Sequence, residues 1–477
     1  MPDASPAAAD RPLAAPNGLR LPSVPDLPVR AAAGALAAGA VAGLTLVGHP
    51  PGLGVALAVV AGAAVVAGAA RRWLGWLGRV LGAAAIVLGI QPVLLDAEWV
   101  VAMALLGAVC LAVLAVLEPA TWRQALRRVV GLAPPAMLAP LTVGRTLTRA
   151  TTTRRGGAAS VARTAAVSLA LLGLFGALFA GADAAFAVVV ERLVPDMDVG
   201  LWPARGFVGA CCALFVAVCV QGLAVRPEAQ TPRSRPPRAT LEWAVPLGLL
   251  DGLFAAFVTL QVIVRVGGRR HVVTTAGVTY AEYAREGFFQ LLVVVALTLL
   301  VVALAPSWVG AVAGRRRHVL HLLLGVLCAL ALVVAASALQ RLLLYEAEFG
   351  FTRLRFTVHA VIWWLAALLV AVLVLGGMRR TALLFRATVV ITAAFAMGFV
   401  ALRPDAVIAA RNVERWRATE RIDVGYLAGL STDAVPAIRA LPPELAGPVI
   451  AQITTRRPAA GTWLGYNVSR ARATPGP

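Results

Sequence analysis

The sequence predicts an all-α polytopic membrane protein: a transmembrane helical bundle of about 11 spans, followed by a short C-terminal polar helical tail. Two observations support this class. Of the 477 residues, 60% are hydrophobic and only 14% are charged, with a mean hydropathy of +0.82, whereas about a quarter of the residues in a soluble domain are charged. Apolar runs of about twenty residues, the length that a helix needs to cross a bilayer, recur along the chain.

Eleven apolar segments have the length of a membrane span. They cover residues 31–48, 53–70, 80–95, 99–117, 165–190, 206–225, 243–264, 286–305, 318–338, 357–376 and 383–402. The third is short and contains Gln91 and Pro92, which leaves the span count open by one.

Composition divides the chain into five parts. Residues 1–30 are rich in Pro and Ala and are predicted to form a disordered cytoplasmic N-tail. Residues 31–225 form a first bundle of about six spans. Residues 226–240 are a basic, Pro-rich cytoplasmic linker. Residues 241–402 form a second bundle of about five spans, and residues 403–477 form an extracytoplasmic C-terminal tail.

The distribution of arginine predicts the orientation in the membrane. All 43 basic residues are arginine, and 24 of them fall in the N-tail and in alternate connections between spans. Cytoplasmic loops carry such an excess, so the N-terminus is predicted to be cytoplasmic and the C-terminus extracytoplasmic, in the cell membrane. The basic 118–164 connection is expected to contact anionic lipids. The arginines are dispersed around spans, which argues against nucleic acid as a partner.

Motifs for metal, cofactor or catalysis are absent from the sequence. The five cysteines all lie in apolar runs and have no ligand spacing. His318 and His321 stand three residues apart but lack a third ligand nearby. No nucleotide-binding loop, nucleophile elbow or zinc-protease motif is present. We therefore expect no metal and no cofactor, and a protein that is more plausibly not an enzyme.

A polar stretch at 269–290 stands out between two apolar spans. Thr279 and Glu282 have the spacing of a capping box, which predicts a helix that begins near Tyr280 and runs to about Ala305. Its charged and aromatic residues could line a polar site at the outer surface, or could simply form a salt-bridged helix start. The candidate binding residues here are Arg269, Arg270, Tyr280, Glu282, Tyr283, Arg285, Glu286 and Gln290.

A second polar stretch, at 340–355, is similar in character and is predicted to emerge on the same side. Gly350 suits a helix end and Thr352 can cap the next helix. A joint site with 269–290 is therefore geometrically possible. Its candidate residues are Tyr345, Glu346, Glu348 and Arg353.

Asp251 is the one acidic residue deep inside the seventh predicted span. A charge at that depth costs several kcal/mol unless it is paired, protonated or exposed to water. Asp251 is therefore either a proton- or ion-linked site or a structural carboxyl that holds helices together.

Three stretches resemble an uncharacterised bacterial family of multi-pass membrane proteins that is catalogued only as a domain of unknown function. They are TYAEYAREGFFQLL at 279–292, YEAEFGFTRLRF at 345–356 and NVERWRATERIDVGYLAGLSTDAVPAI at 412–438. The resemblance implies that these polar positions belong together and that the tail is part of the same unit. It adds five candidate residues from the tail: Asn412, Arg415, Arg421, Asp423 and Tyr426.

The polar motifs gather on one predicted side, which favours a non-enzymatic envelope protein that binds an envelope partner, lipid or signal through its outer surface. The first alternative is a secondary transporter that uses Asp251. The second is a membrane-embedded transferase with Glu282, Glu286 or Glu346 as the base.

Overall fold

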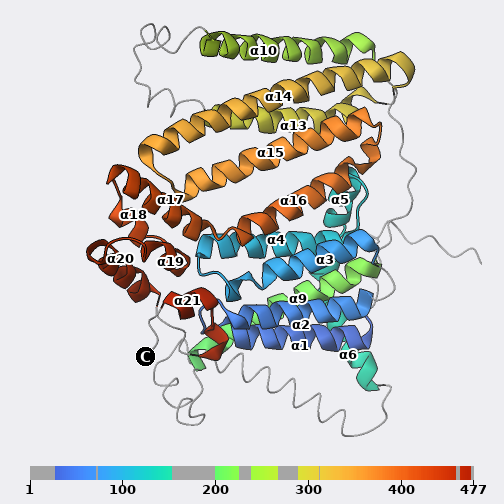
Figure 1. Ribbon diagram of the computed structural model, residues 1–477. Coiled ribbons are helices and arrows are strands. Elements are labelled where there is room, and N and C mark those ends of the chain that lie inside the picture. The colour runs from blue at the N-terminus through green and yellow to red at the C-terminus, as the bar shows by residue number, and fades with distance from the viewer. Residues whose placement is uncertain are drawn as a thin grey trace, which may run out of the picture.

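The computed structural model describes residues 27–70, 74–152, 199–224, 238–266, 288–310, 312–457 and 462–473. Every regular element in these residues is a helix, as the composition predicts, and the long helices lie side by side in a bundle (Figure 1). Most of the predicted N-tail (1–30) and most of the predicted linker at 226–240 lie outside the described residues, and Val29 and Arg30 already belong to the first helix.

Ten helices in the described part of the chain are long and apolar enough to cross a membrane. These are α1 (Val29–Leu46), α2 (Leu53–Ala70), α3 (Trp76–Gly89, continued by the 3-10 turn η1, Gln91–Val93), α4 (Glu98–Leu117), α9 (Trp202–Ala224), α10 (Thr240–Val266), α13 (Phe288–Val309), α14 (Gly314–Phe349), α15 (Arg353–Gly377) and α16 (Leu384–Ala401). They correspond to ten of the eleven predicted spans, and the eleventh, 165–190, lies outside the described residues. The chain is thus an integral membrane protein.

Helix α14 differs most from its predicted span, because it continues to Phe349 rather than ending near residue 338. No Gly or Pro stands between Ala338 and Gly350, so the helix extends beyond the apolar run. Gly350 then ends it with a φ of 77°, and the side chain of Thr352 accepts a hydrogen bond from the Arg355 amide at the start of α15. Both predicted signals are confirmed. The helix start predicted near Tyr280 lies outside the described residues.

Shorter helices occupy the two ends of the bundle. Helices α5 (Trp122–Val130) and α6 (Ala133–Thr152) and the turn η3 (Thr381–Leu383) lie at the end where α1 and α16 begin (Figure 1). The turn η2 (Val199–Leu201) precedes α9 at the opposite end. That opposite end also carries the α14–α15 turn and the residues after α16.

The residues after α16 fold into a small domain, which we call the C-terminal domain (403–457 and 462–473). It consists of α17 (Pro404–Thr419), α18 (Val424–Ala428), η4 (Thr432–Ala434), α19 (Val435–Ile438), α20 (Pro443–Arg456), η5 (Trp463–Gly465) and α21 (Val468–Ala473). Its buried Ile408, Val435 and Ile438 belong to the same apolar core as Leu88 and Val100 of the α3–α4 hairpin. The predicted tail is therefore packed on the bundle.

Four apolar cores hold the described helices together, and the smallest joins Trp243 and Leu247 of α10 to Val309 of α13 and Leu320 of α14. One joins α3, α4, α16 and the C-terminal domain. Another joins α10, α13, α14 and α15. A third joins α1 and α9, where glycines allow a close approach: a Cβ added at Gly209 would stand 2.8 Å from the carbonyl oxygen of Gly39. Small residues at helix interfaces are typical of membrane proteins, because they let dispersion contacts between backbones develop.

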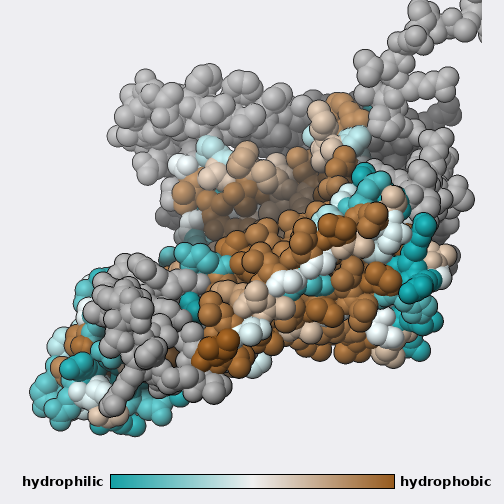
Figure 2. All heavy atoms as spheres, turned by 90° about the horizontal axis from the view of Figure 1, so that it is seen from above, coloured by the Kyte–Doolittle hydropathy of each residue, from teal (hydrophilic) through white to brown (hydrophobic). Residues whose placement is uncertain are grey.

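Hydrophobic residues cover the middle of the molecule, and hydrophilic residues gather on the C-terminal domain (Figure 2). The opposite end carries exposed arginines with few acids beside them, among them Arg316, Arg379 and Arg380. The structure thus has a hydrophobic belt between two polar ends, one formed by the C-terminal domain and the other rich in exposed arginine.

Candidate functional site

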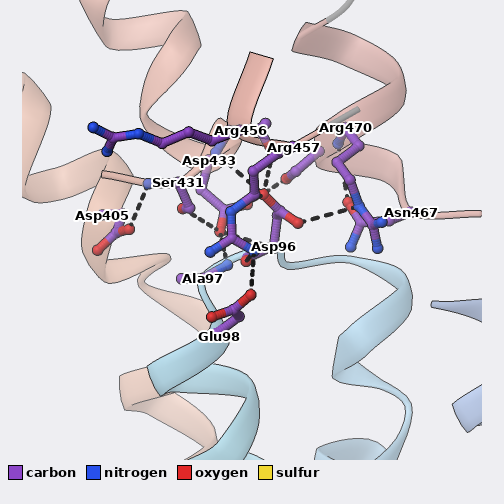
Figure 3. Close-up of polar contacts among 12 residues, drawn as sticks. Asp96, Ala97, Glu98, Asp405, Ser431, Asp433, Arg456, Arg457, Asn467 and Arg470 are labelled. Carbon is purple, nitrogen blue, oxygen red and sulfur yellow. Dashed lines mark hydrogen bonds and ion pairs between the residues drawn. The ribbon is translucent and has the colours of Figure 1, made fainter. Parts of the chain in front are cut away.

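The largest polar cluster lies where the α3–α4 turn meets the C-terminal domain (Figure 3). One Asp433 oxygen accepts hydrogen bonds from the amides of Asp96 and Ala97, both at 3.0 Å. The other accepts one from the Ser469 hydroxyl. Asp96 in turn accepts a hydrogen bond of 3.0 Å from the Thr432 hydroxyl. The two segments therefore bind each other reciprocally through buried carboxylates.

Arginines of the C-terminal domain complete this cluster. Arg470 Nε lies 3.1 Å from an Asp96 oxygen. Arg457 lies 3.5 Å from the other Asp96 oxygen and 2.9 Å from Glu98. Burial raises the pKa of Asp96, and Arg457, Thr432 and Arg470 offset that effect only in part.

A second buried carboxylate, Asp405 at the start of α17, joins the C-terminal domain to α15. It receives two hydrogen bonds from the Arg353 guanidinium, at 2.9 and 2.6 Å. The Ser431 amide and the Trp99 indole also donate to it, at 2.9 and 3.1 Å. Burial acts to raise the pKa of Asp405, but the bidentate Arg353 and the Ser431 bonds outweigh it, and the pKa falls below its ordinary value.

The α14–α15 turn is held by α17. Asn412 accepts a hydrogen bond from the Phe351 amide at 3.1 Å and donates one to the Phe351 carbonyl at 2.8 Å. Arg415 donates to the Glu348 carbonyl at 2.7 Å. These bonds satisfy backbone groups that the turn leaves unpaired. The amide of Arg353 likewise donates to the Tyr426 hydroxyl at 2.7 Å.

A smaller cluster lies beside this turn, inside the α14–α15 hairpin. Glu346 is 7% exposed, and its Oε2 lies 2.7 Å from His359 Nε2. Its Oε1 is buried with no hydrogen-bond partner in the described part of the chain. The Arg355 guanidinium lies 4.3 Å from the centre of the Tyr345 ring. An acid, an arginine and a tyrosine thus lie near one another in this hairpin, and the transferase alternative with Glu346 as the base stays a prediction.

The structure brings together most of the described candidate residues. Two of the three motif stretches meet, since 345–356 contacts 412–426 through the bonds given above. Asp423 caps α18 by accepting a hydrogen bond from the Tyr426 amide at 2.8 Å, and Arg421 is exposed. Two candidates lie apart: Asp251 within α10, and Gln290, exposed on the first turn of α13. The other seven lie outside the described residues: Arg269, Arg270, Tyr280, Glu282, Tyr283, Arg285 and Glu286.

The sequence analysis missed the buried carboxylates that hold these segments. Asp96 and Asp405 stand beside apolar spans, where a single acid is expected to reach the headgroups. Asp433 lies within the third motif stretch and could have been selected there. Among the described residues, no group of three or more His, Cys, Asp or Glu is arranged to hold a metal ion.

Comparison with known proteins places the chain in a family. A family model described as a domain of unknown function (DUF4153) matches residues 82–441. The match covers Asp96, Arg353, Asp405 and Asp433, and it begins earlier than the three motif stretches suggest. No curated protein and no solved structure matches the chain. Because the model covers most of the chain, the protein belongs to the DUF4153 family of unknown function.

Proposed function

We propose that this chain is a non-enzymatic cell-envelope membrane protein whose C-terminal domain binds a protein partner on the extracytoplasmic side. The observation that supports this most directly is that the polar residues of that domain form two groups, one that faces the bundle and one that faces outward. Asp405, Asn412 and Asp433 face the bundle and are engaged there. The outward residues of α17 and the loop after it are exposed. They are Arg411, Glu414, Arg417, Glu420 and Arg421.

The charges on this outward face favour a protein over a lipid surface. Three arginines alternate with two glutamates, and the Arg411–Glu414 pair, with N···O of 3.2 Å, has side chains 63% and 71% exposed. Anionic lipid attracts clusters of one sign, whereas a protein partner can match a mixed pattern and gain specificity from it. The rigid attachment of the domain limits the entropy that is lost on binding.

We infer the orientation in the membrane from the distribution of arginine between the two ends of the molecule. At the end with the C-terminal domain, arginines such as Arg353 and Arg470 are paired with buried carboxylates. At the opposite end Arg316, Arg379 and Arg380 have few acids near them in sequence. An excess of arginine in the connections between spans favours the cytoplasmic side, so we place the C-terminal domain outside. Anionic lipids of the inner leaflet would then contact the arginine-rich end.

A photo-reactive amino acid in place of Glu414 tests the partner. In membranes of the native host, irradiation should give a discrete protein adduct of the full chain. The double variant Arg411→Glu and Arg421→Glu should lose that adduct, because it reverses two charges on the same face. Arg380→Glu, at the opposite end, is the matched control and should keep it. An adduct with phospholipid, or none in any variant, would overturn the proposal.

A further inference from the structure

Helix α10 packs on α14 (Figure 1), and three of its residues, Trp243, Asp251 and Gln261, have buried polar side-chain atoms. At 100° per residue, Trp243, Asp251 and Gln261 fall on one side of the helix. Trp243 Nε1, both Asp251 carboxylate oxygens and Gln261 Nε2 are buried without a hydrogen-bond partner in the described part of the chain. Such groups are uncommon, because a buried polar atom without a hydrogen bond loses its interactions with water and gains none in return.

Their spacing prevents them from satisfying one another. At a rise of about 1.5 Å per residue, Asp251 lies about 12 Å from Trp243 and about 15 Å from Gln261 along the axis. Together they follow the helix through most of the bilayer thickness. Helix α14 runs parallel to α10, since Trp243 shares a core with Leu320, and Phe254 shares one with Cys328. Buried Ser337 of α14 therefore stands near the level of Gln261.

Asp251 lies at the middle of the span Thr240–Ile263 and is 9% exposed. Among the described residues, the elements packed against it offer no cation at that depth. Helix α13 has no charged residue, and α14 has none between Arg317 and Arg341. The titratable groups of α14 in that interval are His318 and His321 at the arginine-rich end, and Cys328, whose thiol is fully buried and close enough to interact electrostatically with Asp251. On α10 itself, Glu242 stands at the first turn.

We propose that Asp251 is a proton-binding site within the membrane, reached along the polar face of α10. An ionised carboxylate without a cation is strongly disfavoured at this depth. Binding of a proton, or of another small monovalent cation, removes that cost. Trp243 and Gln261 supply polar atoms on either side where water can lie. The site lies apart from the proposed partner surface. A carboxyl group that binds a proton within the membrane is what the secondary-transport alternative requires.

A hydrophobic carbodiimide tests the site, because it reacts with protonated carboxyl groups in an apolar environment. The carboxyl proton moves to a carbodiimide nitrogen, the carboxylate oxygen adds to the central carbon, and an acyl shift leaves a stable N-acylurea with no leaving group. With the full chain in vesicles, mass spectrometry should find the adduct on the peptide that contains Asp251 at about pH 5 and less of it at about pH 9. Asp251→Asn should lose it, whereas Glu242→Gln on the same helix should keep it.

The identity of the cation is tested in the same assay. If sodium chloride lowers the labelling of Asp251 and choline chloride does not, sodium competes for the site. If neither does, the site takes a proton alone. Absence of the adduct at acidic pH, in protein that elutes as a single monodisperse species, would overturn the proposal. Labelling that does not change between about pH 5 and about pH 9 would also overturn it, because the carboxyl would then not titrate.

Discussion

Asp405 is the carboxylate on which attachment of the C-terminal domain depends most. Its side chain is fully buried and accepts hydrogen bonds from Arg353, Ser431 and Trp99. Asp405→Asn removes the counter-charge of Arg353, whose side chain is 36% exposed, and weakens charge-assisted hydrogen bonds that contribute about 1.5–3 kcal/mol each. We therefore expect a clear fall in the thermal unfolding temperature in detergent. Glu414→Gln, on the same helix but in an exposed pair, should change it little; equal effects would contradict the assigned role.

The free energy of unfolding should depend on pH through the ionisation of Asp405. Because its pKa in the folded protein lies below the ordinary value of 3.8, the ionised carboxylate stabilises the fold above that value. This contribution is lost as the pH falls through the lowered pKa. The stability difference between the wild type and Asp405→Asn should therefore be full at neutral pH and shrink below pH 3.8. A difference that stays constant down to the acid transition would show that Asp405 does not titrate in this way.

The sequence predicts residue types at the site better than it predicts their partners. Gly350 and Thr352 were identified because their signals are local, a positive φ and an N-cap. The hydrogen bonds of Asp433 to the amides of Asp96 and Ala97 join positions more than 330 residues apart. Nothing in a single sequence marks such a pair, because each acid has an equally plausible local interpretation at the membrane surface.

At the scale of elements, the contact of α1 with α9 depends on glycine. The backbones approach so closely that a methyl group at Gly209 would stand 2.8 Å from the Gly39 carbonyl oxygen. Gly209→Ala should therefore separate the two helices and lower the yield of monodisperse protein. Gly206→Ala on the same helix meets nothing within 4 Å, and alanine favours a helix by up to about 1 kcal/mol over glycine. If both variants behave alike, this interface does not depend on close approach.

Span positions could be predicted because hydropathy alone determines them. The prediction was less accurate where a helix continues into polar sequence, as α14 does up to Phe349. The C-terminal domain was expected only as a short polar helical tail, and its helices, among them α20, confirm that part of the prediction. Its packing on the α3–α4 hairpin depends on buried side chains such as Ile408 and Ile438, whose partners lie far away in sequence.

At the scale of the whole molecule, the chain has a hydrophobic belt between an arginine-rich end and the C-terminal domain (Figure 2). Helix α1 begins at the first end and α16 finishes at the second (Figure 1). Because the long apolar helices between these ends are able to span a membrane, we expect the two polar regions to lie in opposite compartments. Both the proposed partner surface and the proposed orientation depend on this arrangement.

Accessibility of single cysteines tests that arrangement most directly. In a chain whose five native cysteines are replaced by alanine, Glu444→Cys would report on α20 and Arg380→Cys on the arginine-rich end, both at exposed positions. A membrane-impermeant maleimide is added to cells whose outer layers are opened but whose cell membrane stays sealed. It should label the cysteine at position 444. It should label the cysteine at position 380 only after the membrane is permeabilised. Labelling of both cysteines before permeabilisation, or of the cysteine at position 380 alone, would contradict the account.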